Sequence, residues 1–239
     1  MKPKGRTIYE ILMGKNKPVL TPLELQYVNP LKARVGNKVT FDHEPDLKGI
    51  NFEIEKMAVY KTVIKVGDNS KDFYHTDYHL RGISLSMDKP LRFRLRLIPD
   101  PDITNALGSK VQILRLYDEM AWNEGLFNIL NDVSGQFIVN QDDHGVELTQ
   151  PFKYWRIDGV LDPYHATVTS LMDRDGNGKI EEKEIEKHTV SYWDYHRDTE
   201  DPTTKQPYTE YLTIEMNNIS RYFTFLRGTN VDAFQITVY

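Results

Sequence analysis

Oxygen-bearing side chains recur at short intervals in the stretch "MDRDGNGKIEEKE", residues 172–184. Asp173, Asp175 and Asn177 occupy alternate positions, and Glu184 follows after a glycine-containing turn. Ca²⁺ takes six to eight hard oxygen ligands at about 2.3–2.6 Å, and alternate positions on a tight loop turn successive side chains toward one point. The spacing therefore predicts a calcium site.

The stretch resembles the calcium-binding loop of the EF-hand family, with Gly178 at the position where that loop turns sharply. Ile180 matches the usual apolar position, and Glu181 the position that binds through a water. The resemblance implies a ligand set made of the side chains of Asp173, Asp175 and Asn177, the backbone carbonyl of Lys179 and both carboxylate oxygens of Glu184.

The flanks of the loop predict two short helices. Asp162-Pro163 is a typical helix start, and an apolar face follows at Tyr164, Val168 and Leu171. Behind the loop, "EEKEIEKH" is good helix material for barely two turns. We therefore expect an EF-hand-like helix-loop-helix insertion over 162–188.

A second loop of this kind is not found, although calcium sensors of the family usually pair two of them. The acidic "QDDHG" at 141–145 has no glutamate at the required distance. A lone loop is expected to bind Ca²⁺ with a dissociation constant of about 10⁻⁵ to 10⁻³ M, which suits a structural ion better than a signal. The alternative is an acidic turn that does not bind calcium.

Two other groups of residues could do chemistry. His75, Asp77 and His79 share one face of a predicted strand, but i to i+4 spans roughly 13 Å, too far for both imidazoles to reach one metal ion. We expect a polar, solvated face there. Around the loop, His196 is flanked by Asp194 and Asp198, a pattern that general acid/base catalysis and ordinary polar strand faces both use.

The arginine row in "LRFRLRL" predicts a half-buried strand with one wet cationic face. Arg92, Arg94 and Arg96 on that face could meet anionic groups of a partner, and Arg81 and Arg115 could extend the stripe. The alternative, which we favour, is cross-strand pairing with acidic residues such as those of "FEIEKM". Tyrosine-rich stretches such as "SYWDYH" and "QPYTEYLT" suit either a partner surface or a β-sheet.

The elements that position these residues are mainly strands. Apolar and polar residues alternate in many short segments that are rich in Tyr, Phe, Ile, Val and Thr, and turns separate them. A helix is expected around 118–132. We predict a mostly β (α+β) fold of one or two β-sandwich or barrel-like modules, 1–100 and 101–239. A shared "DYH" at 77–79 and 194–196 raises duplication of the two halves as one alternative and similar strand composition as the other.

Composition narrows the classes of protein. The 239 residues are 39% hydrophobic and 27% charged, which is typical of a soluble globular protein, and the net charge of −5 disfavours binding to nucleic acid or to an anionic membrane. No cysteine is present, so disulfides and thiolate zinc sites are excluded. We find no signal peptide or membrane span, and we expect a cytoplasmic location.

Together these observations favour a non-enzymatic binding or structural module with one stabilising Ca²⁺ ion. A hydrolase with a His/Asp site between the two modules, using His196 or His75, is the first alternative. A calcium-regulated interaction protein is the second, and the short exiting helix argues against it.

Overall fold

The computed structural model describes residues 31, 33–41, 47–66, 69–82, 91–98, 110–142, 146–157, 162–172, 185–201 and 203–239. Strands dominate these residues, so the prediction of a mostly β protein is confirmed. The strands are β1 (Lys38–Phe41), β2 (Phe52–Val66), β3 (Asn69–Gly82), β4 (Leu91–Ile98), β5 (Lys110–Ala121), β6 (Gln136–Gln141), β7 (Glu147–Arg156), β8 (Tyr164–Met172), β9 (Ile185–Glu200), β10 (Pro207–Asn217), β11 (Tyr222–Val231) and β12 (Ile236–Val238). The described helices are α3 (Glu124–Leu130) and the 3₁₀ turn η4 (Ala233–Gln235).

The chain forms two compact units, and neither is a single continuous segment. Unit 1 contains the described residues within 1–111, 167–187 and 231–239, and unit 2 contains those within 112–166 and 188–230. The expected modules were consecutive, whereas the chain here passes from one unit to the other several times. The expected boundary near residue 100 falls outside the described residues.

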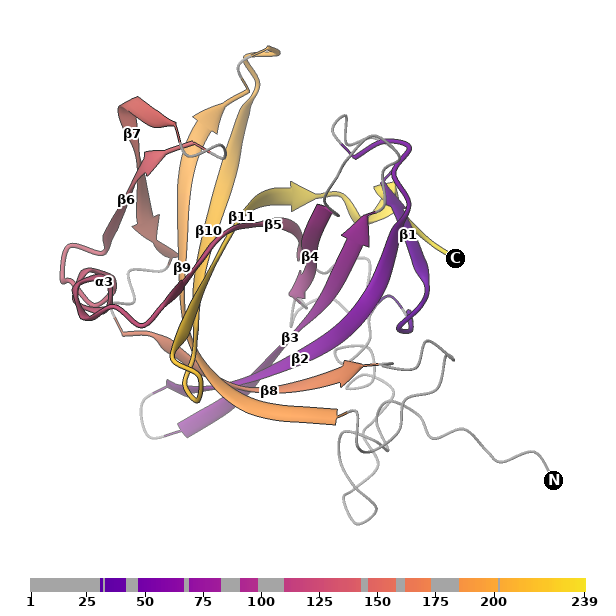
Figure 1. The fold of residues 1–239 in the computed structure, drawn as a ribbon, viewed down its shortest axis with the longest axis horizontal. Helices are drawn as coiled ribbons and strands as arrows, with labels where there is room; N and C mark the ends of the chain where they lie inside the picture. The colour runs from indigo at the N-terminus through magenta and orange to yellow at the C-terminus, as the bar shows by residue number, and fades with distance from the viewer. Residues whose placement is uncertain are drawn as a thin grey trace. The chain divides into compact units, whose positions relative to one another are not determined.

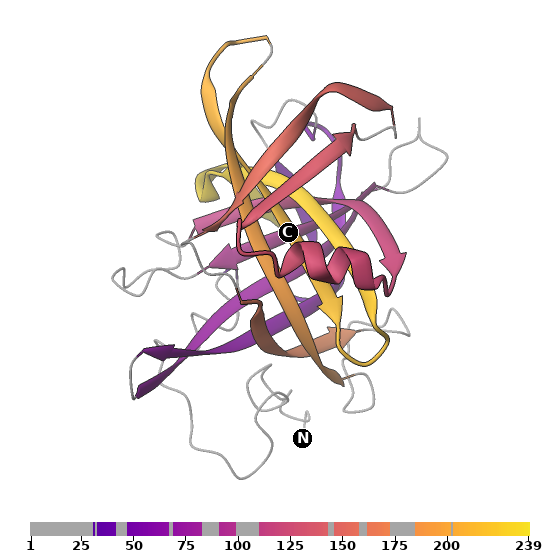
Figure 2. The ribbon, with the colours of Figure 1, turned by 90° about the vertical axis from the view of Figure 1, so that its left-hand side faces the viewer.

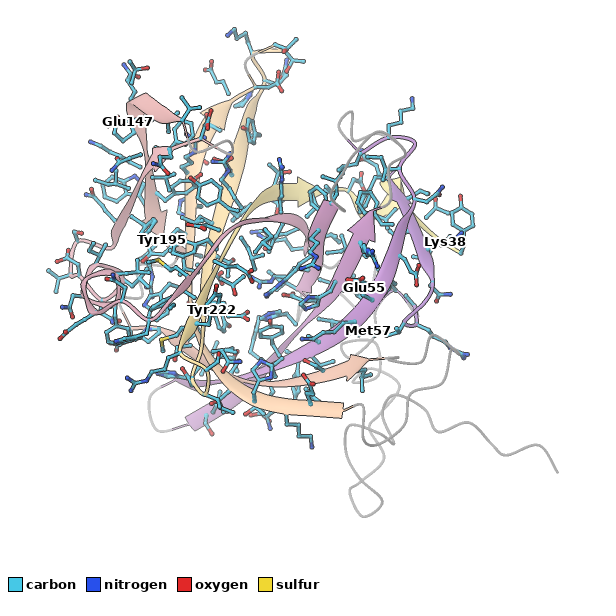
Figure 3. The ribbon with its side chains drawn as sticks, viewed as in Figure 1. Lys38, Glu55, Met57, Glu147, Tyr195 and Tyr222 are labelled. Atoms are coloured by element: carbon cyan, nitrogen blue, oxygen red, sulfur yellow. The ribbon has the colours of Figure 1, made fainter. Side chains whose placement is uncertain are left out.

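Unit 1 is a sheet with the strand order β12-β1-β2-β3-β4, and β8 also pairs with β2. The long strands β2, β3 and β4 run antiparallel to their neighbours and lie side by side in Figure 1. The middle of β3 is buried on both faces, because Asp77 and Tyr78 point to opposite sides and both are fully buried. Along β2, Glu55 is exposed and Met57 is buried (Figure 3).

Unit 2 has the strand order β5-β11-β10-β9-β7-β6. Figure 2 shows α3 and the β6–β7 hairpin lying over one face of β9, β10 and β11. A large aromatic core fills this layer, and Tyr195 (Figure 3), Trp193 and Phe223 belong to it. Gly228 lets β11 approach β5 closely, because a Cβ at this position would collide with the backbone carbonyl of Ile113.

The predicted helices beside the calcium loop are wrong. Residues 164–172 form strand β8, and the residues after the loop begin strand β9 at Ile185. Ala166, Val168 and Ser170 are buried while His165 and Thr167 are exposed, which is the period of a strand. The apolar residues of this segment fit both periods, and the β-branched run from Thr167 to Thr169 favours the strand.

The helix expected around 118–132 is present but shorter. α3 begins at Glu124, where the Asn123 side chain accepts a hydrogen bond from the Leu126 N–H at 2.9 Å. Residues 118–121 instead continue strand β5. Among the described residues, no helix has the length and apolarity that crossing a membrane requires.

Candidate functional site

The His/Asp row and the arginine row, considered separately in the sequence, lie next to each other in unit 1. The antiparallel register of β3 and β4 places Asp77 opposite Arg96, and His79 opposite Arg94. On the other side of β3, His75 stands opposite Tyr60 of β2. Three adjacent strands therefore bring these side chains to one face of the sheet, in a group that we call the Asp77 cluster.

Asp77 is the centre of this cluster. The Arg96 guanidinium donates from Nε to Oδ1 at 3.0 Å and from Nη2 to Oδ2 at 3.1 Å, a bidentate pair in which both side chains are buried. Arg94 Nη1 lies 3.6 Å from Oδ2. Burial alone would raise the pKa of Asp77, but Arg96, His75 and Arg94 outweigh it and hold that pKa below its usual range. Asp77 is therefore a carboxylate at neutral pH.

The two histidines of the cluster are neutral. Burial, and next the charge of Arg96, lower the pKa of His75 to about 3, and burial and Arg94 lower the pKa of His79. The His75 ring stacks on Tyr60 with centroids 4.3 Å apart, and its Nε2 lies 3.8 Å from Asp77 Oδ1. A metal ion here would have to compete with two guanidiniums for the carboxylate. No group of three or more His, Asp or Glu side chains suited to a metal ion occurs in the described part of the chain.

The wet cationic face predicted for β4 is wrong at its inner end. Only 2% of the Arg96 side chain is exposed, because β3 supplies a buried carboxylate directly opposite. The favoured alternative, cross-strand pairing with acidic residues, is confirmed for Arg96 with Asp77. It is also confirmed for Arg81, whose Nη1 lies 3.4 Å from Oε1 of Glu55 in "FEIEKM".

The five predicted calcium ligands, Asp173, Asp175, Asn177, Lys179 and Glu184, lie outside the described residues. The structure does describe both ends of their segment. β8 ends at Met172, β9 begins at Ile185, and the two strands pair with each other. Farther from the loop, the rings of Tyr164 and Tyr192 stack with centroids 5.2 Å apart. Residues 173–184 are therefore the connection between two neighbouring strands.

The sequence around His196 left two interpretations open, general acid/base catalysis and an ordinary polar strand face. The carboxylates on either side of His196 accept hydrogen bonds from threonines of β10: Asp194 from Thr213 at 2.6 Å and Asp198 from Thr209 at 2.9 Å. These are ordinary cross-strand contacts, as expected if this stretch is an ordinary polar strand face.

A serine–histidine contact that sequence reasoning missed joins β8 and β9. His165 Nδ1 lies 3.0 Å from Ser191 Oγ, and Ser191 Oγ donates to Asn218 Oδ1 at 3.0 Å. The single hydroxyl proton of Ser191 is thus directed at the amide and away from the imidazole. A serine nucleophile needs the opposite direction, so the contact ties strands together and does not activate Ser191.

The tyrosines considered for a partner surface are mainly in the interior. Exposure is 6% for Tyr192, 1% for Tyr195 and 8% for Tyr211. The partner-surface prediction therefore does not hold for these three residues, which serve as core residues of the β strands.

Unit 2 holds a second buried carboxylate that sequence reasoning also missed. Glu210 Oε2 accepts a hydrogen bond from the Tyr154 hydroxyl at 2.6 Å and another from Arg197 Nε, while Arg227 Nε lies 3.3 Å from Oε1. Burial, together with the charge of Glu210, raises the pKa of Tyr154. We call these four residues the Glu210 network. A signal was available: Glu210 is the one acid on a strand face that continues as Leu212, Ile214 and Met216.

No protein-family model matches the chain, and no curated protein or solved structure matches it either. We therefore infer its function from three regions of the molecule: the loop between β8 and β9, the Asp77 cluster and the Glu210 network.

Proposed function

We propose that the protein is a non-enzymatic binding or structural β protein stabilised by one Ca²⁺ ion in the 173–184 loop. The observation that carries the proposal is the position of the calcium-ligand spacing in the chain. It runs from Asp173 to Glu184, between β8 and β9, two strands that pair with each other. An ion bound there would tie one strand to the next.

In this proposal Asp173, Asp175 and Asn177 hold the ion through side-chain oxygens, Lys179 through its backbone carbonyl, and Glu184 through both carboxylate oxygens. The ion supplies the positive charge that lets three carboxylates converge on one point. Because the ligands are scattered in the unfolded chain, the free energy of binding adds to the free energy of folding.

The flanking strands support a structural ion rather than a regulatory one. Calcium sensors of the EF-hand family respond by changing the angle between two helices. Here the flanking residues 164–172 and 185–200 are strands, so these flanks are not helices whose angle could change.

The test is a calorimetric Ca²⁺ titration of the chelator-treated protein, with its melting temperature measured before and after. We expect one site in the micromolar to millimolar range and a melting temperature that rises by several degrees. Glu184→Gln should abolish both effects. Glu182→Gln makes the same change of charge at a position that supplies no ligand, and it should keep both. Absence of heat and of any thermal shift at millimolar Ca²⁺ would contradict the proposal.

A further inference from the structure

Unit 2 contains a small open pocket beside the Glu210 network. It has a volume of about 40 Å³, and its lining residues are Arg115, Leu116 and Tyr117 of β5 and Arg227 of β11. Two arginines and a tyrosine from two neighbouring strands are thus among its lining residues. We infer that this pocket binds a small oxyanion, either a carboxylate or a phosphate group.

The first support is the fixed position of Arg227. Only 14% of its side chain is exposed, its Nε lies 3.3 Å from Glu210 Oε1, and its guanidinium stands 5.1 Å from the centre of the Tyr117 ring. Tyr117 is itself held by a hydrogen bond from its hydroxyl to the Gln141 carbonyl at 2.9 Å. The entropy of ordering this arginine is already lost in the folded protein, so a ligand does not bear that cost.

The second support is the local charge. Glu210 is contacted by Arg197 as well as by Arg227, so one carboxylate is shared by two guanidiniums. Arg115 adds a third positive charge in the pocket wall, and the four lining residues include no acid. A guanidinium presents a planar fork of N–H donors that matches the oxygens of carboxylate and phosphate.

The pocket is small and open to solvent, with a volume of about 40 Å³. A ligand larger than one carboxylate or phosphate head group would place only that head group beside the arginines and leave the rest in solvent.

The test follows the backbone amide resonances of residues 115–117 and 227 by NMR while inorganic phosphate or sodium acetate is added to the full chain. Sodium chloride at equal ionic strength is the control for general screening. We expect saturable shifts with a dissociation constant in the millimolar range for phosphate, acetate or both. Phosphate alone would identify a phosphate site, acetate alone a carboxylate site, and both an oxyanion site of broad specificity.

The variant Arg115→Gln tests the pocket at an exposed arginine, whereas Arg227 is also a member of the Glu210 network. It should weaken binding by about tenfold, the loss of one charge-assisted contact. Arg92→Gln removes an exposed arginine of β4 in the same way and should bind as the wild type does. Shifts that chloride reproduces, or that Arg115→Gln leaves unchanged, would overturn the inference. The pocket shares no residue with the 173–184 loop, so this test is independent of calcium.

Discussion

Each unit holds a buried carboxylate between two arginines, and the two arrangements differ in how the carboxylate is shared. In the Asp77 cluster, one guanidinium occupies both oxygens of a fully buried Asp77. In the Glu210 network, the two oxygens are divided among side chains from β7, β9 and β11, and Glu210 retains 7% exposure. The first is closed within the sheet, whereas the second borders an open pocket.

This difference determines how the cost of losing one charge is distributed among the partners. A buried ion pair contributes little net stability against water, but its loss leaves an uncompensated charge that is very costly. That cost should be concentrated at Asp77, which has one dominant partner. It should be spread at Glu210, where each partner carries part of the charge and the arginines are near solvent.

The largest effect is expected for Asp77→Asn. This change leaves Arg96 buried without its counter-charge, and it should lower the free energy of unfolding by about 3–5 kcal/mol, measured by urea denaturation. The double variant Asp77→Leu with Arg96→Met removes both charges and should recover most of that loss. Equal losses in the single and double variants would contradict the assignment of the cost to the unpaired charge of Arg96.

The next effect is the loss of stability in acid. The pKa of His75 is about 3 in the folded protein and near 6.5 in the unfolded chain, so the unfolded chain binds one more proton between these values. The contribution of His75 to the free energy of unfolding is fully present above pH 6.5 and decreases as the pH falls toward 3. From pH 7 to pH 5, His75 alone should remove about 2 kcal/mol, and His79, whose pKa is also lowered, should add to this loss.

The depressed pKa of Asp77 acts in the same direction, but only below its unfolded value of 3.8, so the window from pH 7 to 5 isolates the histidines. Denaturation of His75→Gln at both pH values should show a flatter profile than the wild type. An unchanged slope in His75→Gln would separate acid sensitivity from the Asp77 cluster.

A smaller effect is expected in the Glu210 network. Tyr154→Phe removes one of the hydrogen bonds to Glu210 and leaves both arginines in place, so it should cost about 1.5 kcal/mol by urea denaturation. A loss as large as that of Asp77→Asn would contradict this contrast, because it would show that the stability of the Glu210 network depends on a single partner. Tyr208→Phe is the control. Tyr208 lies on the same strand as Glu210 and is partly exposed, so this change should be close to neutral.

The secondary structure could be predicted where the apolar residues follow a single period. It could not be predicted where they fit both the helix and the strand period. β4 follows from the strict alternation of Leu91 to Leu97 with the arginines. β8 does not, because its apolar residues satisfy a helix pattern as well, and pairing with β2 and β9 decides the outcome. Local sequence does not contain that information.

The sequence shows the spacing of the residues within each row, but it does not show which strands lie beside that row. The spacing of His75, Asp77 and His79 and that of the arginine row could be read directly, yet only the register of β3 with β4 makes them one cluster. The expectation of a wet face assumed that a strand buries one side, and β3 buries both. Glu210 depends on the adjacent strands β9 and β11 and on Tyr154 of β7, which lies 56 residues away in the sequence.

The smallest effect is expected for the exposed pair of Arg81 and Glu55, and it gives the comparison its baseline. Their closest atoms are 3.4 Å apart, and the side chains are 48% and 42% exposed. A double-mutant cycle with Arg81→Gln and Glu55→Gln should give a coupling of about 0.5 kcal/mol or less, because water and salt screen the charges. The pair lies in the same sheet as Asp77 and Arg96 but differs from them in exposure and in having a single contact instead of a bidentate one. A coupling here comparable with that of Asp77 and Arg96 would mean that burial is not what distinguishes the cluster.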